Sequence, residues 1–354
     1  MKDHPPILSL RPDTFASITL PLGTSWLLSD CMEYRGKQDL WIRQKPEALA
    51  ALREQATIQS VESSNRIEGI TVAPGRLRSV VLGESRPKDR SEEELAGYRR
   101  ALDWIYGRKS RVPIDMRTML HLHALCQAGA GDAGKLKARD NEIIEVTQRG
   151  EHLVRYRPTP AKHTRAAMKA LAAAHVAIIS SQEAPSLLIT ATTILDFLCI
   201  HPFRDGNGRV SRLLTTLLLQ QHGFVVGRFI SLERVVEDSK EDYYRILREC
   251  SQGWSEGKNP VLPWWNYFLT VLRRAYAEFA ERVERAETRT GKSDLIRQAA
   301  MCQVGPFTLA DLQSALPSVS APLIKKVLAD LKAERKLTLT GRGRSARWLV
   351  RSVD

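Results

Sequence analysis

Hydrophobic residues recur every three to four positions along most of the chain, and this spacing predicts a mainly helical protein. The stretch PSLLITATTILDFLCI, residues 185–200, is apolar on nearly every side, so we expect it to form a buried central helix. Residues 1–45 hold four prolines and lack a clear period, so we expect them to be irregular and to wrap over the body. Further helices are predicted at about 46–69, 91–106, 114–128, 161–181, 208–222, 239–252 and 261–288.

Several segments interrupt this helical period. Prolines and glycines between about 70 and 90 predict a linker, and Ser91-Glu-Glu-Glu after it resembles a capping box that opens the next helix. Residues 142–157 alternate between apolar and polar on both sides of Gln148–Gly150, which predicts a β-hairpin. Beyond residue 290, the chain predicts short helices at about 292–302, 308–315 and 320–334, followed by two short strands in LTLTGRGRSARWLV.

These changes of pattern predict three parts. They are an N-terminal region at 1–90 that includes the helix at about 46–69, a helical domain with one hairpin at 91–290, and a small domain at 291–354. The fold class is therefore mainly α.

Composition narrows the class of protein. Hydrophobic residues make up 43% and charged residues 26%, so the chain can bury a sizeable core. The five cysteines are widely spaced and form no CxxC pair, which argues against a disulfide framework or a structural zinc site and fits a reducing compartment. The N-terminus has no apolar signal region and no run of 18 apolar residues occurs, so we expect a cytoplasmic protein that does not contact a membrane.

The net charge of +13 favours nucleic acid, phosphate-bearing ligands or acidic partners, although a solvated basic surface accounts for it equally well. Residues 292–354 carry 11 Lys and Arg against 5 Asp and Glu, so the excess is concentrated at this end.

Residues 201–212, HPFRDGNGRVSR, place charge and backbone freedom between two apolar helices. Arg209 and Arg212 are three residues apart and share one face at the start of the helix at 208–222. A helix start offers free N–H groups and a positive dipole end, and Gly206 and Gly208 let the backbone approach a ligand closely. Together these features predict an anion site suited to a polyphosphate.

Two further side chains complete the chemistry of this loop. Asp205 lies beside the predicted phosphate site, where a lone carboxylate can hold Mg²⁺ that takes its other ligands from phosphate and water. His201 ends the buried helix and could accept a proton from an incoming hydroxyl. Each feature alone is most often a turn, a structural histidine or a solvated arginine pair, but together they fit phosphoryl or nucleotidyl transfer.

The stretch HPFRDGNGRVSR resembles the signature of the Fic family, H-x-F-x-[DE]-G-N-G-R-x-x-R, at all eight fixed positions. The resemblance implies a helical bundle with a β-hairpin flap, and transfer of AMP from ATP to a Ser, Thr or Tyr hydroxyl of a target protein. It implies that His201 is the base, that Asp205 holds Mg²⁺, and that Phe203 anchors the loop. It further implies phosphate binding by Gly206, Asn207, Gly208, Arg209 and Arg212.

The stretch SSNRIEGI, residues 63–70, places Ser64 and Glu68 on one helical face before a glycine that suits a helix end. Alone this is most simply a solvated helix face. It also resembles the inhibitory motif [ST]-x-x-x-E-[GN] of Fic proteins, met by Ser64, Glu68 and Gly69. The resemblance implies that Glu68 pairs with Arg212 and denies this arginine to the γ-phosphate of ATP.

Three weaker expectations concern partners. The resemblance implies that the hairpin at 142–157 is a flap on which a target protein docks, whereas the sequence alone also fits a plain surface hairpin. It places Tyr243 near the nucleotide base, although a tyrosine on an amphipathic helix is more often a packing residue. A homodimer that buries the helix of Glu68 would be one way to regulate the inhibition.

The histidine pairs His121 and His123, and His163 and His175, have no convincing third metal ligand, so we interpret them as structural or surface residues.

The predicted elements of the C-terminal domain, three helices and a basic hairpin, resemble a winged helix. In the helix at 320–334 we expect apolar residues inward and lysines outward, with basic residues along the turn, so 320–347 could bind DNA phosphates or else a protein. The inward residues are Leu323, Val327, Leu328 and Leu331, the outward ones are Lys325, Lys326 and Lys332, and those along the turn are Arg342, Arg344 and Arg347.

Three functions remain open at this point. The first is a protein adenylyltransferase that is inhibited by its own Glu68. The second is a DNA-binding regulator whose Fic-like body senses a nucleotide, although such a module has no need of a base at His201. The third is a Fic enzyme that removes AMP from a target.

Overall fold

The structure is a computed structural model of the chain. It describes residues 7–44, 46–108, 111–146, 152–288, 292–341 and 346–351. The helices of the main body are α1 (Pro12–Ala16), α2 (Leu22–Gln44), α3 (Pro46–Ile67), α4 (Pro74–Val81), α5 (Arg90–Tyr106), α6 (Met116–Cys126), α7 (Ala161–Ser181), α8 (Ser186–Ile200), α9 (Asn207–Gln221), α10 (Leu232–Glu237), α11 (Lys240–Ser251) and α12 (Leu262–Thr288), with short 3₁₀ turns at Val226–Arg228 and Trp254–Glu256.

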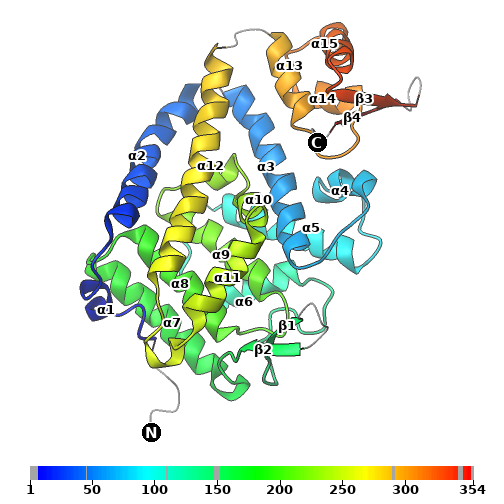
Figure 1. Cartoon of the computed structure of the whole chain (residues 1–354). Coiled ribbons are helices and arrows are strands. Elements are labelled where there is room, and N and C mark those ends of the chain that lie inside the picture. Colours follow the sequence, from blue (N-terminus) through cyan, green and yellow to red (C-terminus); the bar gives the residue numbers. More distant parts are fainter. Residues whose placement is uncertain are drawn as a thin grey trace.

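Helix α8 lies at the centre of this body, as its apolar sequence predicts. Nearly all of its side chains are buried, and it packs against α7, α9 and α12. Helix α9 also packs against α5 and α6, so the connection between α8 and α9 is held by helices on several sides (Figure 1). The loop that carries the predicted chemistry therefore joins the two most buried helices.

The N-terminal segment does not match the expectation of irregular chain. Residues Leu22–Gln44 form the 23-residue helix α2, which packs along the length of α12 (Figure 1). The contact includes polar groups, such as the hydroxyl of Thr24, which donates to the Asn266 side-chain oxygen at 2.7 Å. Apolar side chains such as Trp26 are meanwhile exposed. Buried polar and exposed apolar residues on one helix blur the periodic pattern from which a helix is predicted.

Two local predictions near residue 90 also need correction. Pro74 begins helix α4 inside the predicted linker, since proline is well suited to the first turn of a helix. Helix α5 begins at Arg90 and not at a capping box on Ser91, because the Asp89 side chain accepts the N–H of Glu92 at 2.9 Å.

The predicted hairpin is present, with strand β1 (Ile143–Val146) antiparallel to β2 (His152–Tyr156). Its turn at residues 147–151 lies outside the described residues. The guanidinium of Arg155 on β2 donates to the Tyr244 carbonyl and lies 5.4 Å from the centre of that tyrosine ring. The hairpin is therefore attached to α11.

The C-terminal residues have a hydrophobic core of their own. Ile324, Val327 and Leu328 of α15 are buried in it, whereas Leu323 is half-buried, and the predicted outward lysines Lys325, Lys326 and Lys332 are exposed. Arg347 is exposed, while Arg342 and Arg344 lie outside the described residues. The elements are α13 (Lys292–Met301), α14 (Leu309–Ala315) and α15 (Ala321–Ala333), followed by the antiparallel strands β3 (Leu337–Thr340) and β4 (Arg347–Val350).

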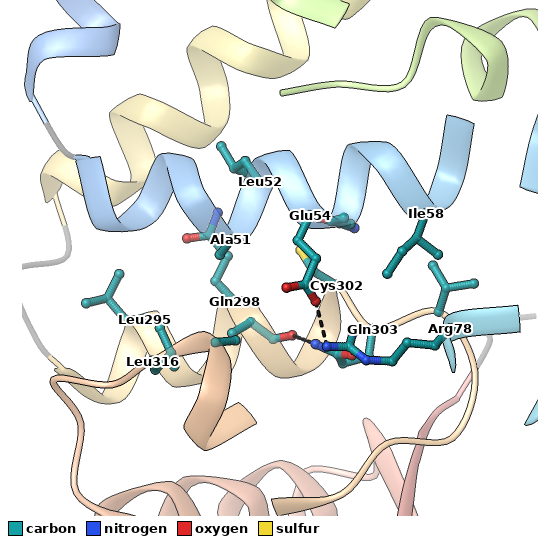
Figure 2. A pocket seen from close by; sticks show the side chains of 14 residues that line it. Ala51, Leu52, Glu54, Ile58, Arg78, Leu295, Gln298, Cys302, Gln303 and Leu316 are labelled. Atoms are coloured by element: carbon teal, nitrogen blue, oxygen red, sulfur yellow. Dashed lines mark hydrogen bonds and ion pairs between the residues drawn. The ribbon is translucent and has the colours of Figure 1, made fainter. Parts of the chain in front are cut away.

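This C-terminal unit contacts the first half of α3 around a small cavity (Figure 2). Arg78 of α4 donates to the Glu54 carboxylate at 2.6 Å and to the Gln303 side-chain oxygen at 3.1 Å. One arginine therefore links α3 to the C-terminal unit. Among the described residues, none of the helices has the length and apolar character needed to cross a membrane.

Candidate active site

The loop between α8 and α9 is closed by its own side chains. His201 ends α8 with φ 51° and ψ 62°, a left-handed conformation that is uncommon outside glycine. Asn207, the first residue of α9, accepts the N–H of Phe203 and donates to the Phe203 carbonyl, both at 2.9 Å. The side chain of Asn207 thus fixes the loop, and what it can offer to a phosphate is its main-chain N–H at the helix start.

Phe203 and His123 pack against each other and support this loop. Phe203 is completely buried and stacks on the His123 ring, with ring centres 3.8 Å apart. The Nδ1 of His123 accepts the N–H of Gly134 at 2.9 Å, so its Nε2 carries the proton and donates to the Asp205 carbonyl at 3.1 Å. Burial lowers the pKa of His123, which keeps this neutral form in place. The interpretation of His123 as structural is confirmed, and the residue is part of the support of the loop.

His201 lines a cavity of about 310 Å³. Burial, together with the nearby Lys137 ammonium, lowers the pKa of its imidazole to about 4, so the ring is neutral at pH 7 and able to accept a proton. The other lining residues come from the end of α3, the hairpin, α8, the start of α9 and α11: Glu68, Glu142, Ile143, Arg155, Tyr156, Leu195, Leu198, Cys199, Gly208, Tyr243, Tyr244, Leu247 and Ser251.

Glu68 and Arg212 form an ion pair at one wall of this cavity. Arg212 donates to the Glu68 carboxylate, to the Ser64 hydroxyl and to the Ser64 carbonyl, each at 2.8 Å. Burial alone would lower the pKa of Arg212, but the Glu68 carboxylate raises it above the usual value and keeps the guanidinium charged. Glu68 lines the cavity and Arg212 does not, so the carboxylate occupies the side of the arginine that a ligand would approach.

Gly208 leaves room for this ion pair. A Cβ atom at this position would lie 2.0 Å from the Glu68 carboxylate oxygen and 3.3 Å from a guanidinium nitrogen of Arg212. A side chain at residue 208 would therefore displace the carboxylate. The absence of a side chain also places the Gly208 backbone, near the start of α9, at the wall of the cavity. Gly69 has φ 81° directly after Glu68, which fits the predicted helix end.

Arg209 lies elsewhere, although it starts the same helix. It is completely buried and forms an ion pair with Glu94 of α5. One of its nitrogens lies 3.6 Å from the Asp205 carboxylate. Arg209 does not line the cavity. Its charge is balanced by Glu94, and its contacts with Glu94 and Asp205 connect the loop to α5.

Asp205 is the exposed carboxylate of the loop. One of its oxygens accepts the N–H of Gly206 at 2.6 Å, and the other lies 3.7 Å from Arg90 as well as near Arg209. No group of three His, Cys, Asp or Glu side chains suited to a metal occurs among the described residues. Asp205 is exposed, so its carboxylate can offer one oxygen to a magnesium ion whose other ligands would be phosphate and water.

Tyr243 and Tyr244 form the wall that belongs to α11. Tyr243 is buried in an aromatic cluster with Trp264 and Tyr267, and it also lines the cavity. Tyr244 is half-buried, lines the cavity and is covered by Arg155 of the hairpin. The sequence drew attention to Tyr243 alone. Tyr244 and Arg155 were missed, because only folding brings the hairpin against α11.

Comparisons with known proteins find related sequences and folds. Residues 113–219 match the Fic/DOC family. The chain is 25% identical over 209 residues to a protein named protein adenylyltransferase Fic from Nematostella vectensis, covering 56% of this chain and 44% of that relative. The chain spans about half the length of the curated relatives that it matches.

Solved structures show the fold. A Fic family protein from Desulfovibrio desulfuricans G20 superimposes with a TM-score of 0.60 at 22% identity, covering 95% of this chain and 98% of that chain. Fic-1 from C. elegans superimposes with a TM-score of 0.57 at 19% identity, covering 75% of this chain and 73% of that chain. Residues 113–219 therefore form a Fic/DOC family domain, and the chain shares the fold of solved Fic proteins.

Proposed function

We propose that this protein transfers AMP from ATP to a Ser, Thr or Tyr hydroxyl of a target protein. The observation that carries the proposal is the position of His201. A neutral imidazole lines a cavity whose wall also contains the start of α9, and the anion-binding groups of that helix start are the ones a polyphosphate needs. The named relative is an adenylyltransferase, which supports the same chemistry.

The proposed reaction is an in-line displacement at the α-phosphate. The target hydroxyl gives its proton to His201 while its oxygen forms a bond to the α-phosphorus. The bond from that phosphorus to the bridging oxygen of the leaving group breaks, and pyrophosphate leaves with the bonding electrons. The N–H groups at the start of α9 and the Arg212 guanidinium stabilise charge on the phosphates. Asp205 would hold magnesium, which neutralises phosphate charge when bound.

Glu68 is proposed to inhibit this reaction. Its carboxylate accepts a hydrogen bond from Arg212 on the side that faces the cavity, so the guanidinium cannot also bind the terminal phosphate of ATP. ATP bound without this contact would place its α-phosphate poorly for attack. The hairpin residues 142–157, part of which lie outside the described residues, are proposed to dock the target through strand pairing.

The proposal is tested with ATP labelled at the α-phosphate, Mg²⁺ and three purified forms of the full chain. These are wild type, Glu68→Gly, and Glu68→Gly combined with His201→Ala. We expect self-labelling in Glu68→Gly, much less in wild type, and none in the double variant. Absence of label from every form, with ATP binding intact, would refute AMP transfer. Stronger labelling of wild type than of Glu68→Gly would refute the inhibitory role.

A second proposed function is binding of duplex DNA by residues 320–347. The supporting observation is that Lys325, Lys326 and Lys332 are all exposed on α15, opposite its buried apolar face. Binding of a labelled duplex by the full chain should fall steeply with added salt. The variant Lys325→Glu with Lys326→Glu should bind more weakly. If wild type does not bind the duplex even at low salt, this second function is wrong.

A further inference from the structure

The segment before the hairpin, residues 134–141, donates hydrogen bonds to main-chain carbonyls in and beside the loop between α8 and α9. The N–H of Lys137 donates to the Pro202 carbonyl at 2.9 Å, and its ammonium lies 3.4 Å from the Ile200 carbonyl. The same ammonium donates to the Asn141 side-chain oxygen at 2.7 Å. The Asn141 amide in turn donates to the Phe203 carbonyl at 3.2 Å.

These contacts hold the residues on both sides of His201. The left-handed backbone of His201 is disfavoured for a residue with a side chain, so it persists only where its neighbours are fixed. Ile200 is the last residue of α8, and carbonyls in a final helical turn lack a partner within the helix. The Lys137 ammonium supplies a donor there and places positive charge at the negative end of the helix dipole.

Lys137 is nearly completely buried, which is unusual for an ammonium group. Burial lowers its pKa to about 8, so the side chain is still charged at pH 7. An apolar side chain would fill this space without the cost of burying a charge. The buried charge therefore has a role other than packing. It makes the contacts with Asn141 and Ile200, and it acts electrostatically on the nearby His201 imidazole.

We propose that Lys137 is a positioning residue for His201: it fixes the backbone on both sides of the histidine and holds a positive charge beside the imidazole. This charge opposes protonation of His201 and so keeps the base in its neutral form. The proposal rests on the proposed function, in which His201 accepts the proton of the target hydroxyl.

Charged and titratable groups reach His201 from several elements. After burial, Lys137 is the main influence that lowers the pKa of His201, whereas the Leu198 carbonyl and the carboxylates of Glu68 and Asp205 raise it. Removing the Lys137 charge should therefore shift the pKa of His201 upward. The remaining groups that line the same cavity are Glu142, Arg155 and Tyr156 of the hairpin segment and Tyr243 and Tyr244 of α11.

The test compares Lys137→Met, Lys137→Gln and Lys137→Arg in the Glu68→Gly chain. The control is Lys135→Met, which removes an exposed lysine whose ammonium contacts the Gly131 carbonyl. The first readout is the pKa of His201 in chains with isotope-labelled histidine, followed by NMR and assigned by loss of the signal in His201→Ala. The second readout is the pH profile of AMP transfer.

In Lys137→Met and Lys137→Gln we expect the pKa of His201 to rise by about one unit. Transfer requires neutral His201, so the acidic limb of the pH profile should move to higher pH by the same amount. The maximal rate should fall about tenfold or more in Lys137→Met, because the loop is less well fixed. Lys137→Arg should restore most of the rate and the original pKa, and Lys135→Met should change neither.

The proposal is overturned if the pKa of His201 in Lys137→Gln equals that of its parent, or if Lys137→Met and Lys135→Met have the same rate. Lys137→Gln keeps a hydrogen-bond donor, so it tests the charge even where Lys137→Met fails to fold. If the Glu68→Gly parent transfers no AMP, the proposed function fails, while the NMR titration still decides whether Lys137 acts on His201.

Discussion

Two arginines near the start of helix α9 each form an ion pair with a glutamate, and the two pairs differ in their exposure to solvent. In the Arg209–Glu94 pair, the side chains are 0% and 5% exposed. In the Arg212–Glu68 pair, the arginine is 7% exposed but the glutamate is 28% exposed and lines the cavity. The arginines are three residues apart on one helix, so the difference lies in their partners.

This difference separates a structural ion pair from one that a ligand can replace. A phosphate in the cavity can approach Arg212 from the side that Glu68 occupies, and it can take the place of the carboxylate with little loss of electrostatic energy. Glu94 is enclosed on α5, so any ligand that replaced it would have to enter the core. The same chemical pair therefore fixes the loop at one position and is suited to regulation at the other.

The largest expected effect on stability is that of Glu94→Ala. Removal of the carboxylate leaves the completely buried Arg209 guanidinium with only the more distant, exposed Asp205 carboxylate, which should lower the free energy of unfolding by about 3–5 kcal/mol. Chemical denaturation of the full chain measures the change. Replacement of both partners, Arg209→Met with Glu94→Leu, should restore most of the stability because no charge is left buried. A loss below about 1 kcal/mol in Glu94→Ala would contradict the structural role.

Glu68→Gly should change activity much more than stability. It should raise AMP transfer by about 5-fold to 150-fold, the usual range of a coupling between two sites, with a much smaller loss of stability than Glu94→Ala. Labelled ATP and the same denaturation experiment measure both effects. The matched control is Glu62→Ala, which removes a carboxylate of α3 that pairs with Arg66. Equal activation by the control would show that α3 is loosened in general and that the Arg212 contact is not the cause.

The sequence predicts the fold where apolar periodicity and burial agree. Helices α8 and α9 are found because their apolar residues face a core and a distinctive loop joins them. Helix α2 is missed because buried polar groups such as Thr24 and exposed apolar groups such as Trp26 hide its period. Glu94 shows the same limit in detail. Its spacing from Ser91 is typical of a capping box, but the side chain turns inward to Arg209.

For the candidate site, the sequence predicts the parts that lie in one stretch. His201, Asp205 and Arg212 follow from the loop and its helix start, and the pairing of Glu68 with Arg212 was available only through resemblance to a family. Lys137 and His123 were not identified as parts of the site, because their contacts are to main-chain atoms about 60–80 residues away. A main-chain carbonyl leaves no mark in a sequence, so no spacing rule could have indicated these contacts.

Ser64→Ala sharpens the contrast at the Arg212–Glu68 pair. The Ser64 hydroxyl accepts from Arg212 at 2.8 Å, but the Ser64 carbonyl and Glu68 still bind the guanidinium when the hydroxyl is removed. Loss of one hydrogen bond of about 1 kcal/mol should raise AMP transfer by about fivefold at most. The measurement is the labelling rate beside wild type and Glu68→Gly. If Ser64→Ala activates as strongly as Glu68→Gly, the serine and not the carboxylate holds Arg212.

The smallest expected effect is that of Arg90→Ala, which tests burial as the cause of the difference. Arg90 donates to the same Glu94 carboxylate at 2.7 Å, yet its own side chain is 73% exposed. An exposed ion pair contributes little, so this variant should lose less than about 1 kcal/mol of unfolding free energy while Glu94 keeps its bond to Arg209. The measurement is denaturation in parallel with Glu94→Ala. Equal losses in the two variants would mean that contact with Glu94 determines stability regardless of burial, and the contrast between the two arginine pairs would then need another explanation.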